Sequence, residues 1–115
     1  MKKTSRGSRK KLPPIWAEKV SRLEEVVAHE FGFGTTNEIW KHVRTPYNCW
    51  ARWVTWHRML KWGISSVMAG QYSGYNHSTV LYGANCLARD SVQFDELQLI
   101  IARINTKWSE QPPIE

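Results

Sequence analysis

Residues 65–89 read SSVMAGQYSGYNHSTVLYGANCLAR, and this stretch decides the fold. The serines that begin it and Asn76 are suited to cap helices, because their side-chain oxygens can accept hydrogen bonds from the N–H groups of a first helical turn. A Ser-Gly pair lies between the two caps and is typical of a tight turn. The spacing predicts two helices joined by that turn, residues 65–72 and 77–89, in the arrangement of a helix-turn-helix.

We call these two predicted helices and their turn, residues 65–89, the corner. Apolar residues at helical spacing extend the pattern on both sides of it. They recur every three to five residues, which places them on one face of a helix. Glycines end the first and the third of the additional helices, and Pro46 marks a predicted loop before the third. The additional predicted helices cover residues 15–31, a short segment ending near His42, residues 49–62 and residues 91–108. No segment alternates as a strand would, so the predicted class is all-α, a compact bundle of about six helices.

Length and composition exclude several classes of protein. A chain of 115 residues suffices for one compact domain and is too short for an enzyme with a separate nucleotide-binding domain. No apolar run approaches the ~18–20 residues of a membrane span. Neither glycine-rich phosphate motif is present, and Cys49 and Cys86 form neither a disulfide framework nor a zinc pattern. We expect no catalytic residues, metal, cofactor, small-molecule substrate or membrane contact, in a reducing cytoplasm.

Basic residues gather in two parts of the chain. Six of the sixteen lysines and arginines lie among the first eleven residues, and ten bases then balance ten acids over the rest. Residues 39–89 hold no acid, yet they hold six bases and three histidines. A basic arm in front of an acid-free segment favours a polyanionic partner, above all nucleic acid. The alternative is a solvated basic face preceded by a basic terminus of an ordinary kind.

The pattern also divides the chain into three parts. Residues 1–12 are almost without apolar side chains, so we expect a disordered basic arm. Pro13 and Pro14 end that arm and suit the first turn of a helix. We expect a single helical DNA-binding domain over residues 13–110 and a short tail over residues 111–115.

The second helix of the corner begins with four consecutive polar residues. They are Asn76, His77, Ser78 and Thr79. A recognition helix directs the side chains of its first turn at base edges in the major groove, where each of these four can form hydrogen bonds. Asn76 and Ser78 can alternatively be cap residues only, which would leave His77 and Thr79 unexplained.

The run from Tyr72 to Ala84 resembles the C-terminal DNA-binding domain of the bacterial replication initiator DnaA. The hallmark of that family is an aromatic-Gly-Gly-Arg-Asp-His-Thr-Thr-Val-Leu-His-Ala run. The residues that match it are Tyr72, Gly74, His77, Thr79, Val80 and Leu81, with Ser78 a near match. Weaker similarity covers about residues 20–105 in the same helix order. The family's Arg-Asp is Tyr75-Asn76 here, and these residues contain no ATP-binding module.

This resemblance implies a helix-turn-helix fold like that of the DnaA C-terminal domain and the Trp repressor. Asparagine can pair with adenine at two points whereas the family's Asp suits cytosine, so we expect adenine beneath Asn76. Ser66 and nearby backbone N–H groups could hold a phosphate, and Arg44 and Arg52 would hold phosphates or reach a minor groove. The predicted DNA-binding residues are Arg44, Arg52, Ser66, Tyr75, Asn76, His77, Ser78 and Thr79.

Two functions remain open at this point. The first is sequence-specific binding of double-stranded DNA by a regulator of replication or transcription without ATPase activity, located in the cytoplasm and associated with the nucleoid. The second is an adaptor that keeps the fold and contacts a protein, such as a replication component, through exposed tryptophans. Four tryptophans between residues 50 and 62 suggest that alternative. For Trp50 and Val54 we favour packing in the core.

Overall fold

The computed structural model describes residues 9–109, and every regular element in that range is helical. The elements are α1 (Pro14–Glu30), the 3-10 helix η2 (Thr36–Trp40), α2 (Pro46–Trp62), α3 (Ser66–Ser73), α4 (His77–Gln93) and α5 (Asp95–Ser109). The predicted all-α class is confirmed. Five α-helices and one short 3-10 helix stand where about six helices were predicted. Residues 1–8 of the predicted arm and the predicted tail lie outside the described residues.

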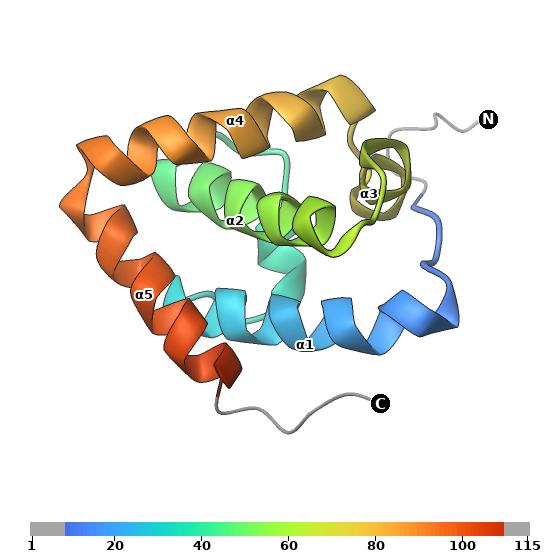
Figure 1. The fold of residues 1–115 in the computed structure, drawn as a ribbon, viewed down its shortest axis with the longest axis horizontal. Helices are drawn as coiled ribbons and strands as arrows, with labels where there is room; N and C mark the ends of the chain where they lie inside the picture. Colours follow the sequence, from blue (N-terminus) through green and yellow to red (C-terminus); the bar gives the residue numbers. More distant parts are fainter. Residues whose placement is uncertain (1–8, 110–115) are drawn as a thin grey trace.

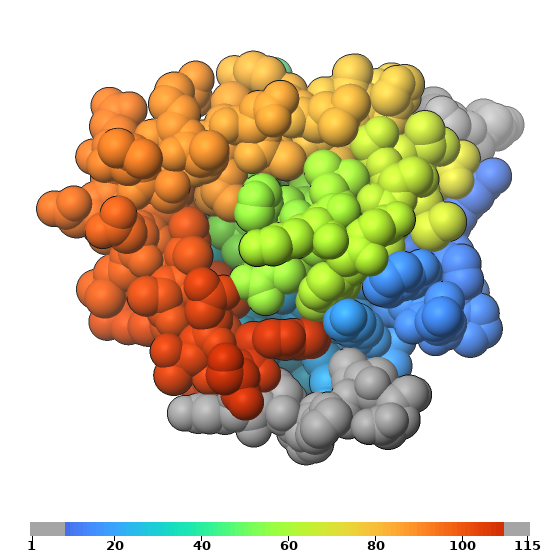
Figure 2. Space-filling model, viewed as in Figure 1, coloured from blue at the N-terminus to red at the C-terminus, as the bar shows by residue number. Residues whose placement is uncertain are grey.

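Helix α2 is the centre of the bundle. It packs against α4, α1, α3 and η2, with α4 along one side and α1 along the other (Figure 1). Helix α5 turns back from the end of α4 and packs against α1, which closes the bundle. In the space-filling view, side chains of α2 fill the space between α4, α5 and α1 (Figure 2).

The core contains fully buried side chains from all six elements. The members without exposed surface are Val20, Leu23, Val27, Ile39, Ala51, Trp56, Met59, Ala69, Val80, Leu97 and Ile104. Burial of one large apolar side chain contributes ~1.5–3 kcal/mol relative to its exposure. Short helices have little stability alone, so this shared cluster holds them in place.

The tryptophans of α2 belong mostly to this core. Core packing of Trp50 and Val54 is confirmed, because only 7% and 5% of these residues are exposed. Trp56 is completely buried and donates its indole N–H to the Ser73 hydroxyl at 3.1 Å. The other tryptophans between residues 9 and 109 are buried or half-buried. Within residues 9–109, no tryptophan is fully exposed to serve as the protein contact that the adaptor alternative requires.

Two helix boundaries differ from the prediction for a local reason. Helix α2 begins at Pro46 rather than at residue 49, because proline fits a first turn and the preceding threonine caps it. Helix α4 continues to Gln93 because the Ser91 hydroxyl donates to a backbone carbonyl one turn earlier instead of capping a new helix. The last helix consequently starts at Asp95.

Residues 9–12 belong to the folded domain, although the sequence places them in a disordered arm. The side chain of Leu12 is part of the core. Arg9 Nε and the backbone N–H of Lys10 donate hydrogen bonds of 2.6 and 2.9 Å to backbone oxygens in the last turn of α3. The chain therefore enters the domain beside the α3–α4 corner.

Candidate nucleic-acid interface

The turn between α3 and α4 is fixed by two glycines. Gly74 ends α3 with a φ of 83°, a left-handed conformation that glycine adopts without steric cost. The carbonyl of Gly70 accepts hydrogen bonds from the N–H groups of Gly74 at 2.8 Å and Tyr75 at 2.9 Å. A Cβ atom on Gly70 would lie 2.5 Å from the Tyr75 carbonyl oxygen. The backbones at Gly70 and Tyr75 therefore lie too close together for any residue larger than glycine at position 70.

The polar run at the start of α4 divides into two pairs. Asn76 caps the helix, since its Oδ1 accepts hydrogen bonds from the Ser78 backbone N–H at 2.8 Å and the Ser78 hydroxyl at 2.6 Å. The cap alternative thus accounts for Asn76 and Ser78 in the unbound protein. His77 and Thr79 are exposed, and within residues 9–109 neither side chain has a hydrogen-bond partner. These two side chains are available to a ligand.

Tyr75 points into the fold, although the sequence assigns it to the DNA-binding residues. Its hydroxyl donates to the backbone oxygens of Trp40 and Lys41, both at 3.0 Å. Its ring stacks on His42 with centroids 4.2 Å apart and meets Trp56 edge-on at 5.2 Å. Tyr75 therefore ties the start of α4 to the segment that follows η2, residues 41–45, which we call the basic loop.

Arg52, which the sequence assigns to phosphate contact, supports the basic loop in the unbound chain. Only 6% of the residue is exposed. Its two terminal nitrogens donate to the backbone oxygens of Lys41 at 2.6 Å and Val43 at 3.0 Å, and the guanidinium lies 5.3 Å from the centroid of the Tyr75 ring. A phosphate could reach this guanidinium only if the loop moved away. Arg52 therefore holds the backbone of the loop against α2.

The basic loop presents three exposed side chains that can carry positive charge. Arg44 is exposed, as the predicted site requires. Lys41 is exposed and forms an ion pair of 2.9 Å with Glu38, and His42 is exposed beside Tyr75. The predicted DNA-binding residues include neither Lys41 nor His42. Tyr75 is the sequence feature that distinguishes this loop, because its ring stacks on His42 and its hydroxyl bonds to the Lys41 backbone. These contacts are visible only in the folded chain.

The α3 flank of the corner carries Ser66 and Arg9. Ser66 is the first residue of α3 and is half-buried. The cap is the preceding residue, Ser65, whose hydroxyl accepts the Met68 N–H at 3.1 Å. The Arg9 guanidinium lies 4.9 Å from the centroid of the Tyr72 ring. Arg9 is therefore a base close to the corner that the predicted site did not include.

A buried carboxylate supports this flank from inside. Glu24 of α1 is 6% exposed and accepts hydrogen bonds of 2.7 Å from the Trp40 indole N–H and the Tyr72 hydroxyl. Burial raises the pKa of the Glu24 carboxyl, and the two hydrogen bonds oppose that rise only in part. Glu24 thus joins α1, η2 and α3 beneath the corner.

Two further properties bear on the kind of ligand. Among residues 9–109, no three side chains of the metal-binding types converge on one point. No helix in that part of the chain combines the length and the apolar character needed to cross a bilayer. Comparison with known proteins adds no relative: no protein-family model, no curated protein and no solved structure matches this chain.

Proposed function

We propose that this chain binds double-stranded DNA with sequence preference through α3 and α4, used as a helix-turn-helix of the DnaA C-terminal type. The observation that carries the proposal is the exposed pair His77 and Thr79 in the first turn of α4, with the exposed bases of the basic loop and Arg9 close to the corner. In this proposal the protein acts by occupying or marking a site on DNA, without ATPase activity. That action suits a regulator of replication or transcription associated with the nucleoid.

The first turn of α4 would enter the major groove. Recognition helices read bases with their N-terminal side chains, and imidazole and hydroxyl groups can each donate or accept at a base edge. Asn76 keeps its amide N–H groups for a base acceptor while its oxygen caps the helix. Pairing with adenine at two points would require Asn76 to give up the cap, so single-point contact is the expected mode in the complex.

The flanking bases would hold the phosphate backbone. The basic loop supplies Lys41, His42 and Arg44, and the segment beside the end of α3 supplies Arg9 with exposed Lys10 and Lys11. Such contacts fix the register of a protein on the duplex without reading sequence. Because Arg52 and Tyr75 hold the backbone of the loop, its cations are positioned before DNA arrives, which lowers the ordering cost of binding.

Selection from a pool of random duplexes with the purified chain tests this proposal. We expect one enriched motif, and we expect His77→Ala to weaken binding to it by ~1–3 kcal/mol while binding to random duplex changes little. Asn85→Ala is a matched control, because Asn85 is exposed on α4 two turns further along. Failure to enrich any motif at low salt would contradict the proposal and favour the adaptor alternative.

A further inference from the structure

A hollow lined by aromatic rings lies where α2 begins and α4 turns into α5. Its volume is about 440 Å³, and its lining is almost entirely apolar. Pockets that bind small ligands or single peptide segments have volumes of roughly 300–1,000 Å³. The residues around it are Thr45, Pro46, Tyr47, Trp50, Phe94 and Glu96. We call it the aromatic pocket.

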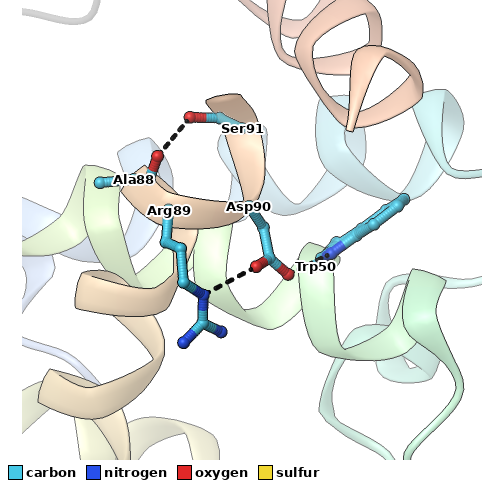
Figure 3. A network of polar contacts seen from close by, with 5 residues as sticks. All are labelled: Trp50, Ala88, Arg89, Asp90 and Ser91. Atoms are coloured by element: carbon cyan, nitrogen blue, oxygen red, sulfur yellow. Dashed lines mark hydrogen bonds and ion pairs between the residues drawn. The ribbon is translucent and has the colours of Figure 1, made fainter. Parts of the chain in front are cut away.

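Hydrogen bonds and ring contacts hold the walls of the aromatic pocket. The Trp50 ring lies 6.0 Å from the ring of Tyr47 and 5.5 Å from the ring of Phe94. The Trp50 indole N–H donates to Asp90 at 3.1 Å, and Asp90 also accepts from Arg89 at 3.2 Å (Figure 3). The Tyr47 hydroxyl donates to a carboxylate at the start of α5. The rings are therefore fixed before anything binds.

The pocket presents apolar surface to solvent far from the first turn of α4, although Thr45 of the basic loop forms part of its wall. Tyr47 and Phe94 are 36% and 40% exposed. Phe94 follows His77 by the full length of α4, which at 1.5 Å per residue is about 25 Å. An occupant of the pocket would therefore leave the first turn of α4 accessible.

The chain contains a segment with the chemistry that such a pocket selects. Grooves lined by aromatic rings bind proline-rich segments, because proline rings stack on aromatic faces and lose little conformational entropy on binding. Three of the five prolines, Pro13, Pro14 and Pro46, lie at the starts of helices in the fold. The other two belong to the sequence Pro112-Pro113-Ile114, beyond the described residues.

Distance decides which copy of the chain supplies that segment. Glu96, at the rim of the pocket, and Ser109 lie near opposite ends of α5, about 20 Å apart at the rise of an α-helix. Extended chain covers at most ~3.6 Å per residue, so Pro113 can lie no more than ~14 Å from Ser109. Only a fully extended tail running straight back along α5 would bring the segment to the rim of its own pocket, so a second copy can seat the prolines there more readily.

We propose that the aromatic pocket binds Pro112-Pro113-Ile114 of a second copy of this chain. The pocket and the segment are different surfaces, so each copy can give one and receive one. Such a head-to-tail contact continues from copy to copy unless the rotation closes a ring. The association would link copies while leaving the first turn of α4 of each copy accessible, and it would place the partner's segment beside the basic loop, because Thr45 lines the pocket.

Nuclear magnetic resonance on the full isotope-labelled chain tests the binding step. The probe is a synthetic peptide of residues 109–115, and the readout is the Trp50 indole N–H signal, assigned by its loss in Trp50→Phe. We expect the peptide to shift this signal, and a peptide with both prolines replaced by alanine to bind at least tenfold more weakly. A Trp50 signal unmoved by the first peptide would overturn the proposal.

Sedimentation equilibrium without DNA tests the association step and is independent of the proposed DNA binding. We expect concentration-dependent association that Phe94→Ala and Pro113→Ala each weaken at least fivefold. Leu99→Ala is the control, because Leu99 is exposed on α5 and does not line the pocket. An association constant that neither Phe94→Ala nor Pro113→Ala changes would refute the proposal. The proposal would also be refuted if Pro113→Ala shifted the Trp50 indole N–H signal in a sample that contains only monomer. In that case the segment would occupy the pocket of its own chain.

Discussion

The rings of His42 and Tyr75 stack with centroids 4.2 Å apart and planes 16° from parallel. His42 belongs to the basic loop, and Tyr75 is the last residue before the cap of α4. The stack, together with the Tyr75 hydroxyl on the Lys41 carbonyl, makes one rigid unit of the cations of the loop and the polar turn of the helix. Tyr75 thus connects the basic loop to the start of α4.

Tyr75→Phe tests that positioning role. The variant keeps the ring stack but removes the hydrogen bonds to two backbone carbonyls. We expect the free energy of unfolding to fall by about 0.5–1.5 kcal/mol, the usual net value of such a contact. Duplex affinity should fall as well, because the loop must be ordered on binding. Urea denaturation and fluorescence anisotropy measure the two effects. Unchanged affinity despite lower stability would show that the loop does not contact DNA.

Deletion of residues 1–8 tests the part played by the basic arm. The deletion removes Lys2, Lys3 and Arg6 but keeps the contacts that anchor Arg9 and Lys10 on α3. If five to seven phosphates are neutralised, the slope of log affinity against log salt should be about −4 to −6, and loss of three cations should reduce its magnitude by about 2–3.

The same deletion should leave the selected motif and the thermal stability as they are, because phosphate contacts carry no direct sequence information. Titrations at four salt concentrations and a repeated selection supply the measurements. A motif that changes on deletion would mean that the arm reads bases in the minor groove.

Local sequence pattern was sufficient for the starts of α3 and α4, but not for the start of α2 or the end of α4. Helices α3 and α4 begin directly after Ser65 and Asn76, as the predicted caps require. The short helix near His42 was less predictable. It is a 3-10 helix ending at Trp40, and the residue before it, Thr35, makes no side-chain cap to extend it. Capping chemistry is local, so it can be seen in the sequence.

The roles of the bases were not predictable from local pattern. Arg52 is held by carbonyls nine and eleven residues away in an irregular loop. The path of that loop depends in turn on Tyr75, which is 34 residues from Lys41. In the sequence, Arg52 and Arg44 are equivalent positive charges. Only the tertiary contacts separate a buried base that supports the loop from an exposed base that can meet a phosphate.

Gly70→Ala should disrupt the corner. The added methyl group would lie 2.5 Å from a backbone oxygen of Tyr75, so α3 and α4 must separate. We expect a loss of about 1–3 kcal/mol in the free energy of unfolding, as for other overpacked sites. Gly34→Ala is the control, because nothing lies within 4 Å of its added carbon. Equal stability of the two variants in urea denaturation would contradict the close crossing of the backbone.

Glu24→Gln should change how stability depends on pH. Burial raises the pKa of Glu24 above its usual 4.5, so the folded chain holds this proton more tightly than the unfolded chain. The stabilisation from the proton is complete below pH 4.5 and is lost as the pH rises through the raised pKa. Glutamine keeps an oxygen that can accept from Trp40 and Tyr72 but does not ionise.

We therefore expect the free energy of unfolding of the natural chain, relative to Glu24→Gln, to fall with rising pH across that interval and to level off above it. Urea denaturation of both proteins between pH 4 and pH 8 measures the difference. A difference that rises with pH would show that the two hydrogen bonds outweigh burial and that the carboxylate is the favoured form.

Asn76→Asp separates capping from base recognition at the start of α4. A carboxylate caps as well as an amide, so the free energy of unfolding should change by only a few tenths of a kcal/mol, whereas Asn76→Ala should cost about 1 kcal/mol. The aspartate loses the amide donor and brings a negative charge close to phosphates. At ~4 Å in water one such repulsion is worth about 1 kcal/mol, so low-salt binding to any duplex should weaken by a factor of about five.

Selection from random duplexes with the natural chain and with Asn76→Asp, at matched salt, then compares the two motifs. We expect them to differ at the base pair beneath residue 76, because a donor facing a base acceptor has been replaced by a group that can only accept. The rest of the motif should persist, since His77 and Thr79 are unaltered. Identical motifs, with only the uniform loss of affinity, would show that Asn76 caps the helix and reads no base.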